Sequence, residues 1–80
     1  MARETDQIAQ DYSAMGDSVA LITDVIAGDR KASDSAADRQ ACVDRNVKHL
    51  EIMVAKDDWG SESMTATNAA IKAGNGYTAS

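Results

Sequence analysis

The reactive side chains of this sequence are few: it contains one cysteine, Cys42, and one histidine, His49. On a helix, two residues seven apart share a face about two turns apart, so a thiol and an imidazole could act as nucleophile and base. The sequence supplies neither an oxyanion loop nor a third group to orient the imidazole. We therefore interpret Cys42 as a small residue beside a core and His49 as a polar flank. The chain is predicted not to be an enzyme and to use no cofactor.

A small acidic cluster, Asp57, Asp58 and Glu62, is the other candidate for chemistry. It lacks the alternating oxygen ligands and the twelfth-position glutamate of a calcium-binding loop. The single thiol is too few for a structural zinc site and cannot form an internal disulfide. No glycine-rich phosphate loop follows a predicted strand. We interpret the cluster as a solvated helix end and predict no metal site.

The composition describes a small chain with a poor supply of core residues. Its 80 residues make one domain at most, near the size at which about 60% of the unfolded surface is buried. Alanine contributes 15 residues, whereas Leu, Ile, Val and Phe together contribute 12 of 80, or 15%. The absence of proline and a net charge of only −5 argue against disorder. Such a chain forms helices but buries little surface alone, so we predict that it packs against other chains.

The charge pattern restricts the classes of partner. Residues 1–27 carry Arg3 against five acidic residues, and six of the eight basic residues lie interleaved with acids in 28–58. Because no basic cluster exists to neutralise phosphates, neither nucleic acid nor an anionic membrane is a predicted partner. The polar N-terminus predicts no signal peptide, and no apolar run approaches the roughly 18 residues of a membrane span. The default expectation is synthesis in a reducing cytoplasm.

Two runs of large apolar residues are spaced 4-3-4-3-4, which is the pattern of a heptad seam. The first seam is Ile8, Tyr12, Met15, Val19, Ile22 and Ile26. The second seam is Ala36, Gln40, Val43, Val47, Leu50 and Val54. The two seams are in phase with each other, and a polar segment separates them.

Two arrangements fit these seams. In the first, Gly28 ends one helix and Ser33 or Ser35 caps a second helix that folds back as an antiparallel hairpin. In the second, one helix from Thr5 to Asp57 forms a strand of a multi-chain coiled coil. The in-phase register favours the long helix. The glycine break, with an acidic first helix facing a second that carries bases, favours the hairpin.

A shorter element follows the second seam. Ser61 or Ser63 is placed to cap a third helix, and Gly74-Asn75-Gly76 is predicted to stop it through a left-handed backbone. Trp59 is predicted to anchor the corner between the second and third helices, or else to be an exposed contact for a partner. The sequence therefore predicts a single all-α domain over 1–80, with helices at about 4–27, 35–57 and 61–73.

One part of the sequence resembles a known class of proteins. Residues 46–74, through HLEIM at 49–53, Trp59, MTA at 64–66 and NAAI at 68–71, look like the C-terminal part of small helical proteins encoded among the structural genes of tailed bacteriophages. The resemblance covers about a third of the chain and contains no chemical motif. It implies a minor virion component at the head–tail junction, tail or fibre, and no catalytic residue.

Two functional hypotheses follow from these observations. The first is a structural protein of a phage particle, located in the virion, that forms a homo-oligomer or joins a larger assembly by helix–helix packing. The second is a small acidic regulatory or adaptor protein that masks a partner. The residues predicted to make the contacts are Ile8, Tyr12, Met15, Val19, Ile22, Ile26, Val43, Val47, Leu50, Val54 and Trp59.

Overall fold

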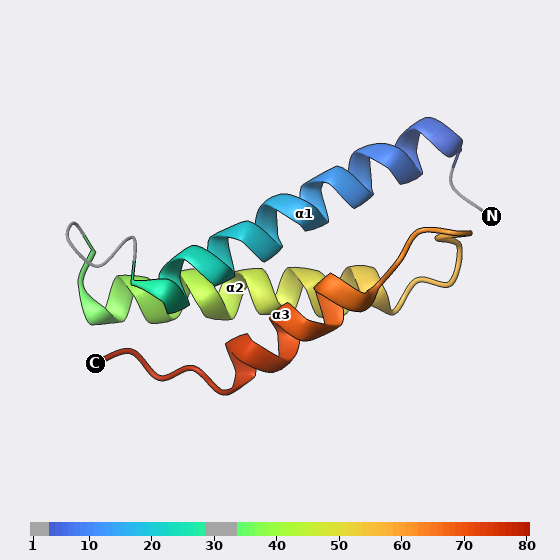
Figure 1. The fold of residues 1–80 in the computed structure, drawn as a ribbon. Helices are drawn as coiled ribbons and strands as arrows, with labels where there is room; N and C mark the ends of the chain where they lie inside the picture. Colours follow the sequence, from blue (N-terminus) through green and yellow to red (C-terminus); the bar gives the residue numbers. More distant parts are fainter. Residues whose placement is uncertain (1–3, 29–33) are drawn as a thin grey trace.

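Three helices, each antiparallel to the next along the chain, form the fold of a computed structural model that describes residues 4–28 and 34–80. The helices are α1 (Thr5–Ala27), α2 (Ala36–Val54) and α3 (Thr65–Asn75). Figure 1 shows α1 and α3 running in one direction and α2 returning beside them, and every pair of helices is in contact. The described ranges contain helices and no strand, which confirms the predicted all-α class.

The hairpin is the arrangement that the structure adopts, and the single long helix is wrong. Gly28 takes the left-handed conformation with φ of 90°, and its N–H donates to the carbonyl of Val25 at 3.1 Å. Ser35 is the cap of α2, because its hydroxyl accepts the N–H of Asp38 at 3.1 Å. A glycine C-cap followed by a serine N-cap separates two helices in the manner that local helix chemistry favours. Ser33, the alternative cap, lies outside the described residues.

The core lies between the three helices, and the residues buried in it differ in part from the two predicted seams. Val25 is 2% exposed whereas the predicted seam residue Ile26 is 41% exposed, and Met53 is buried in preference to Val54. The buried residues of α1 are Met15, Ser18, Ile22 and Val25, so the face that packs against the other helices is centred to one side of the predicted seam. The buried hydrophobic residues are Met15, Ile22, Val25, Val43, Val47, Leu50, Met53, Trp59 and Ala70.

The connection between α2 and α3 is longer than the sequence predicts. α2 ends at Val54, three residues before the predicted end, and Gly60 turns the chain with φ of 64°. α3 begins at Thr65 with Met64 at its N-cap and no side-chain cap, so the predicted caps Ser61 and Ser63 are wrong. The hydroxyl of Ser63 accepts the Thr65 N–H at 3.3 Å. The longer connection is the segment that brings Trp59 back against the helices.

The end of α3 also differs from the prediction. Gly74 lies inside α3 and is buried, and the helix continues to Asn75. Gly76 caps it with φ of −89°, so no left-handed residue is used there. A Cβ added at Gly74 would overlap Cγ2 of Val47 and lie 3.3 Å from Cγ1 of Val43. Gly74 therefore serves the close approach of α3 to α2 and is not a stop signal.

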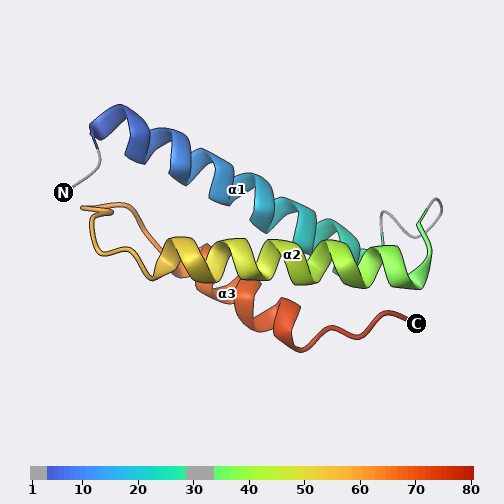
Figure 2. The ribbon, with the colours of Figure 1, turned by 180° about the vertical axis from the view of Figure 1, so that it is seen from behind.

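The C-terminal segment is held against α2, as the view from behind in Figure 2 shows. The side-chain amide of Gln40 accepts the Ala79 N–H at 2.8 Å and donates to the Tyr77 carbonyl at 3.3 Å. Arg39 Nη2 donates to the main-chain oxygen of Ser80 at 2.7 Å. Gln40, a polar residue in a predicted apolar seam, therefore satisfies the backbone of the segment that follows α3.

Within residues 4–28 and 34–80, none of the helices combines the length and the apolar character that crossing a bilayer requires.

The close approach at Gly74 predicts opposite effects for two glycine substitutions. We expect Gly74→Ala to destabilise the fold by about 1–3 kcal/mol, because the new methyl overlaps Val47 in a packed core. We expect Gly16→Ala to stabilise it by roughly 0.5–1 kcal/mol, because Gly16 lies within α1 and its added Cβ meets nothing within 4 Å. Urea unfolding followed by circular dichroism measures both, and equal effects would contradict the proposed packing.

Candidate docking surface along the first helix

Most residues predicted to contact other chains are covered by this chain's own helices. Ile8, Tyr12 and Val19 are half-buried and pack against the core, Val54 is half-buried, and Ile26 is exposed. Because the hairpin and α3 use the seams themselves, the buried members are core residues in this fold and not a free surface. Those buried members are Met15, Ile22, Val43, Val47, Leu50 and Trp59.

Trp59 fills the wedge where α1 and α2 diverge. Both ribbon views show the start of α1 rising away from the end of α2, with the connecting segment beside the gap. Trp59 is 7% exposed, and its indole N–H donates to the Met53 carbonyl at 3.0 Å. Its ring lies 6.1 Å from the ring of Tyr12 at 59°, a favourable tilted geometry. The Tyr12 hydroxyl donates to the Ser63 carbonyl at 2.8 Å. Tyr12 of α1 therefore contacts the connecting segment at both Trp59 and Ser63.

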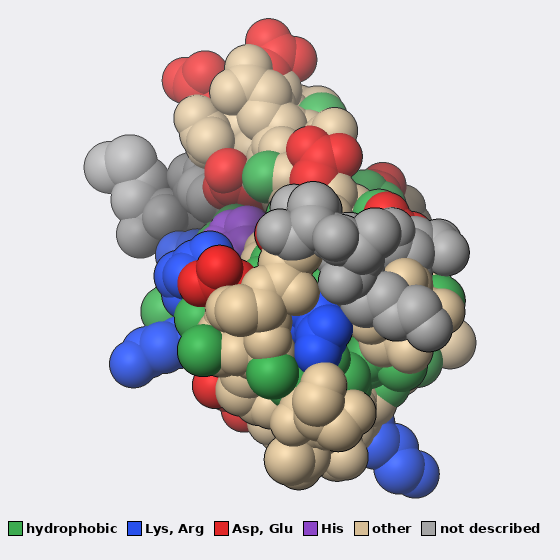
Figure 3. All heavy atoms as spheres, turned by 90° about the vertical axis from the view of Figure 1, so that its left-hand side faces the viewer, with side chains coloured by type: hydrophobic (Ala, Val, Ile, Leu, Met, Phe, Trp, Pro, Cys, Tyr) green, Lys and Arg blue, Asp and Glu red, His purple; other side chains and the backbone are tan. Residues whose placement is uncertain are grey.

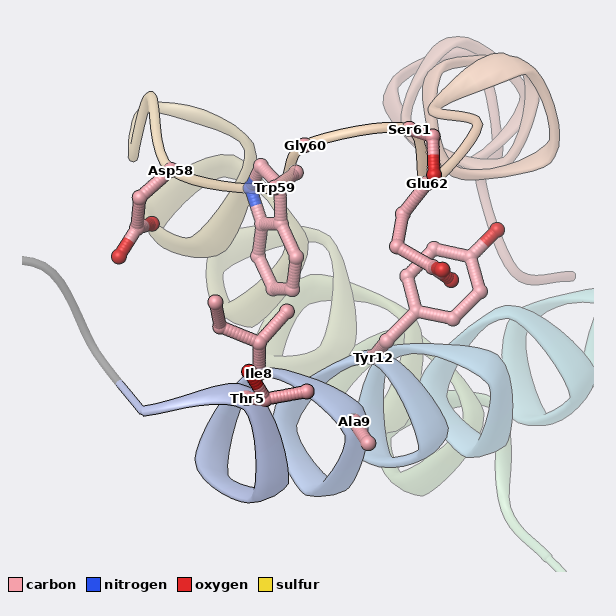
Figure 4. A pocket seen from close by; sticks show the side chains of 9 residues that line it. All are labelled: Thr5, Ile8, Ala9, Tyr12, Asp58, Trp59, Gly60, Ser61 and Glu62. Carbon is pink, nitrogen blue, oxygen red and sulfur yellow. The ribbon is translucent and has the colours of Figure 1, made fainter.

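A pocket of about 360 Å³, here called the corner pocket, opens between the start of α1 and this corner. Figure 4 shows Trp59 pointing down toward Ile8 from the connecting segment, with Glu62 above Tyr12 at the side. Aromatic and aliphatic side chains form its interior, and Asp58 and Glu62 add carboxylates from the connecting segment. The residues that line it are Thr5, Ile8, Ala9, Tyr12, Asp58, Trp59, Gly60, Ser61 and Glu62.

A second hollow, here called the alanine groove, lies between the later half of α1 and α3 and has a volume of about 370 Å³. Thr23 contributes the one polar side chain among its lining residues, and Ile26 is a large aliphatic residue left 41% exposed beside it. The alanines follow the i, i+3, i+4, i+7 spacing of one helix face. The lining residues are Val19, Ile22, Thr23, Ile26, Ala27, Ala66, Ala69, Ala70 and Ala73.

The corner pocket and the alanine groove lie in line along α1. Four residues of α1 line the corner pocket (Thr5, Ile8, Ala9, Tyr12), and the residues 14 positions later (Val19, Ile22, Thr23, Ile26) line the alanine groove. Fourteen residues are two heptads, which corresponds to about 21 Å along a helix. The two faces differ by roughly 40° on a straight helix, the drift that a left-handed supercoil follows. A single helix that wraps along α1 would therefore reach both hollows.

The exposed face of α1 beside these hollows consists of small residues. They are spaced 4-3-4-3-4 and all are exposed: Ala9, Ser13, Gly16, Ala20, Thr23 and Ala27. All four charged residues of α1 are acidic: Asp6, Asp11, Asp17 and Asp24. Figure 3 shows acidic side chains at the top of the end view, where α1 rises, and the basic side chains lower down. The surface beside α1 therefore admits a close neighbour and carries a negative potential.

Cys42 and His49 have different hydrogen-bond partners in the structure. His49 Nδ1 lies 2.9 Å from the hydroxyl of Ser18, which is 6% exposed between α1 and α2. Cys42 Sγ instead lies 3.7 Å from Nδ2 of Asn46 on its own helix. A buried serine against an imidazole links the two helices, but neither Ser18 nor His49 lines the corner pocket or the alanine groove. The arrangement supports a packing role for His49.

The roles of Ser18, Gln40 and the alanines of the groove were not predicted from the sequence, although Gln40 was named as a seam position. Ser18 lies one residue before a seam position, and Gln40 lies on a seam. A polar residue at or beside an apolar stripe is the sequence feature that could have indicated the structural role of each. The alanines of the groove carry no such signal, because alanine is common throughout the chain. Among the described residues, no three His, Cys, Asp or Glu side chains are grouped as a metal would require. The acids Asp57, Asp58 and Glu62 do not form such a group either.

Comparison of the chain with protein-family models, curated proteins and solved structures found no significant match.

The Ser18–His49 contact predicts a stability effect that an exposed serine does not share. We expect Ser18→Ala to destabilise the fold by about 1 kcal/mol, because it removes a buried hydroxyl and leaves the His49 imidazole without that partner. Ser13→Ala is the control, since Ser13 is exposed on the same helix, and it should lie within about 0.5 kcal/mol of the parent chain. Thermal unfolding checks both variants, and an unchanged Ser18→Ala variant would contradict the packing role.

Proposed function

We propose that this chain is a non-enzymatic structural or assembly protein of a phage particle, which acts by accepting a helix of another protein in the alanine groove. The observation that carries the proposal is the groove itself: an apolar hollow of about 370 Å³ that α1 and α3 leave open. Helix-in-groove docking is a common mode of protein recognition, in which residues at i, i+3, i+4 and i+7 of the ligand enter a hydrophobic groove.

The lining of the groove suits a helix better than a small polar ligand. Ala66, Ala69 and Ala73 are small and exposed, so the backbone of a neighbouring helix can approach α3 closely. Ile26 is exposed in the unbound chain and would be covered by the neighbour. Burial of apolar surface is the main favourable contribution to association, at roughly 25 cal/mol per Å² before the costs of ordering.

Charge favours a basic or mixed-charge helix as the occupant. α1 contains no basic residue, and Asp17 and Asp24 flank its face of small residues. Two copies of α1 placed against each other would bring these acids together, which opposes self-association through this face. The occupant proposed here is therefore an amphipathic helix of a different protein, with basic residues beside its apolar stripe.

The phage particle is the setting that the sequence resemblance over residues 46–74 implies, and the groove gives that setting a mechanism. A minor virion component needs a surface that joins it to its neighbours, and it needs no catalytic centre. The rival setting, an acidic regulatory or adaptor protein, uses the same surface on a soluble target. The negative charge of α1 favours this rival equally, so composition of the particle is the measurement that separates the two.

A charged side chain in the alanine groove is predicted to abolish docking without unfolding the chain. We expect Ala69→Glu to weaken incorporation into particles by about tenfold or more, because it places an unpaired carboxylate in an apolar interface. Its stability should change by less than about 0.5 kcal/mol, because Ala69 is exposed. The measurement is quantitative mass spectrometry of particles assembled by a phage that lacks the gene and is supplied with each variant.

The matched control is Ala37→Glu, which places the same side chain at an exposed position of α2 away from the groove. It should be incorporated like the parent chain. Particles of unchanged composition and infectivity after deletion of the gene would overturn the structural role. Absence from particles together with a one-to-one complex with a single soluble protein, lost in Ala69→Glu, would establish the regulatory alternative.

A further inference from the structure

The corner pocket combines an apolar interior with acidic surroundings. Ile8, Tyr12 and Trp59 supply its aliphatic and aromatic walls, and Glu62 is an exposed carboxylate beside them. The described residues 4–12 and 56–62 hold six acids, which are Glu4, Asp6, Asp11, Asp57, Asp58 and Glu62, against one base, Lys56. Over those residues alone the formal charge is 1 − 6 = −5, and Arg3 precedes them in the sequence. A ligand with a positive charge is the one that this end of the molecule attracts.

The walls specify an organic cation and not a metal ion. The described acids do not form a group of three that would hold a metal, and metals of the carboxylate class require several oxygen ligands. Aromatic faces attract a guanidinium or ammonium group through their negative quadrupole, and an aliphatic stem packs on apolar walls. The half-buried Tyr12 is the ring with more surface left for such a contact, because Trp59 is 7% exposed. An arginine side chain has both parts, and its planar head also stacks on aromatic rings.

Hydrogen bonds hold the two aromatic rings of the corner pocket in fixed orientations. The Trp59 indole N–H and the Tyr12 hydroxyl are both engaged with main-chain carbonyls, at 3.0 and 2.8 Å, which fixes the two rings. Neither ring has to reorganise when a ligand enters, so little of the binding free energy is lost to ordering. Glu62 is exposed and can move toward an incoming cation.

We propose that the corner pocket binds an arginine or lysine side chain carried by the helix that docks in the alanine groove. The partner is thereby defined as a helix of about four turns or more, with an apolar stripe for the groove and a basic residue about 21 Å away for the pocket. This assignment of the partner rests on the proposed function, because the groove supplies the rest of the helix. The affinity of the corner pocket for the cation does not depend on the proposed function.

The test uses the intact chain and two small probes, Nα-acetyl-arginine amide and its neutral isostere Nα-acetyl-citrulline amide. Trp59 is the single tryptophan, so its indole N–H gives one resolved nuclear magnetic resonance signal beside the pocket. We expect the arginine probe to shift this signal saturably, with a dissociation constant on the order of millimolar. The citrulline probe should bind about tenfold more weakly or not at all, and raising the salt concentration should weaken the arginine probe.

Two variants locate the binding. Glu62→Gln should weaken the arginine probe about threefold, the loss of one exposed ion pair. Glu51→Gln is the control, because Glu51 is exposed on α2 and lines none of the described hollows, and it should bind like the parent chain. Equal shifts with citrulline, equal weakening in both variants, or no saturable shift well above millimolar concentration would each overturn the proposal.

The outcomes separate this inference from the proposed function. Ala69→Glu should lose docking and retain arginine binding, because Ala69 does not line the corner pocket. If the arginine probe binds and docking is absent, the groove proposal fails alone. If particles incorporate the chain normally and the probe does not bind, the pocket proposal fails alone.

Discussion

The close contact between α2 and α3 at Gly74 is the constraint on which the rest of the structure depends. The chain has few large aliphatic residues, so its helices must approach closely for their small side chains to exclude water. Gly74 permits this approach because its missing Cβ is the space that Val47 and Val43 occupy. With α3 held there, its alanines lie beside α1 and form one side of the groove. The docking surface is thus a consequence of how the core is closed.

The opposite end of the molecule solves a different packing problem. α1 and α2 diverge toward the start of α1, and the small residues common in this chain are too small to fill the wedge between them. One large side chain, Trp59, fills it and is fixed by its hydrogen bond to the Met53 carbonyl. The corner pocket opens between the start of α1 and the segment that carries Trp59. The alanine groove therefore accompanies the close helix contact at Gly74, and the corner pocket accompanies the large side chain of Trp59.

Much of the fold followed from the sequence, and the differences have physical causes. The helix at 5–27 was predictable from its apolar stripe and Gly28, whereas the hairpin was one of two arrangements that the seams allowed, with Ser33 and Ser35 both possible caps. The role of Gly74 was not, since a glycine at a helix end and a glycine at a close contact look alike in one sequence. Likewise, a heptad seam does not reveal whether its partner is another chain or the next helix of the same chain. The alanine groove was not predictable because it depends on how α3 is rotated against α1.

The hydrogen bond between Ser18 and His49 has a consequence for the uniqueness of the fold. Helices faced with small and similar side chains can slide past one another by a turn with little change in apolar burial. A slide of α2 by one turn would place Arg45 or Met53 opposite Ser18, and the hydroxyl and the imidazole would both lose their partner. A polar pair inside an apolar interface therefore favours one longitudinal register of the hairpin, as a buried polar residue does in a coiled coil. In this chain, the only histidine contributes to the selection of one alignment, together with the close contact at Gly74.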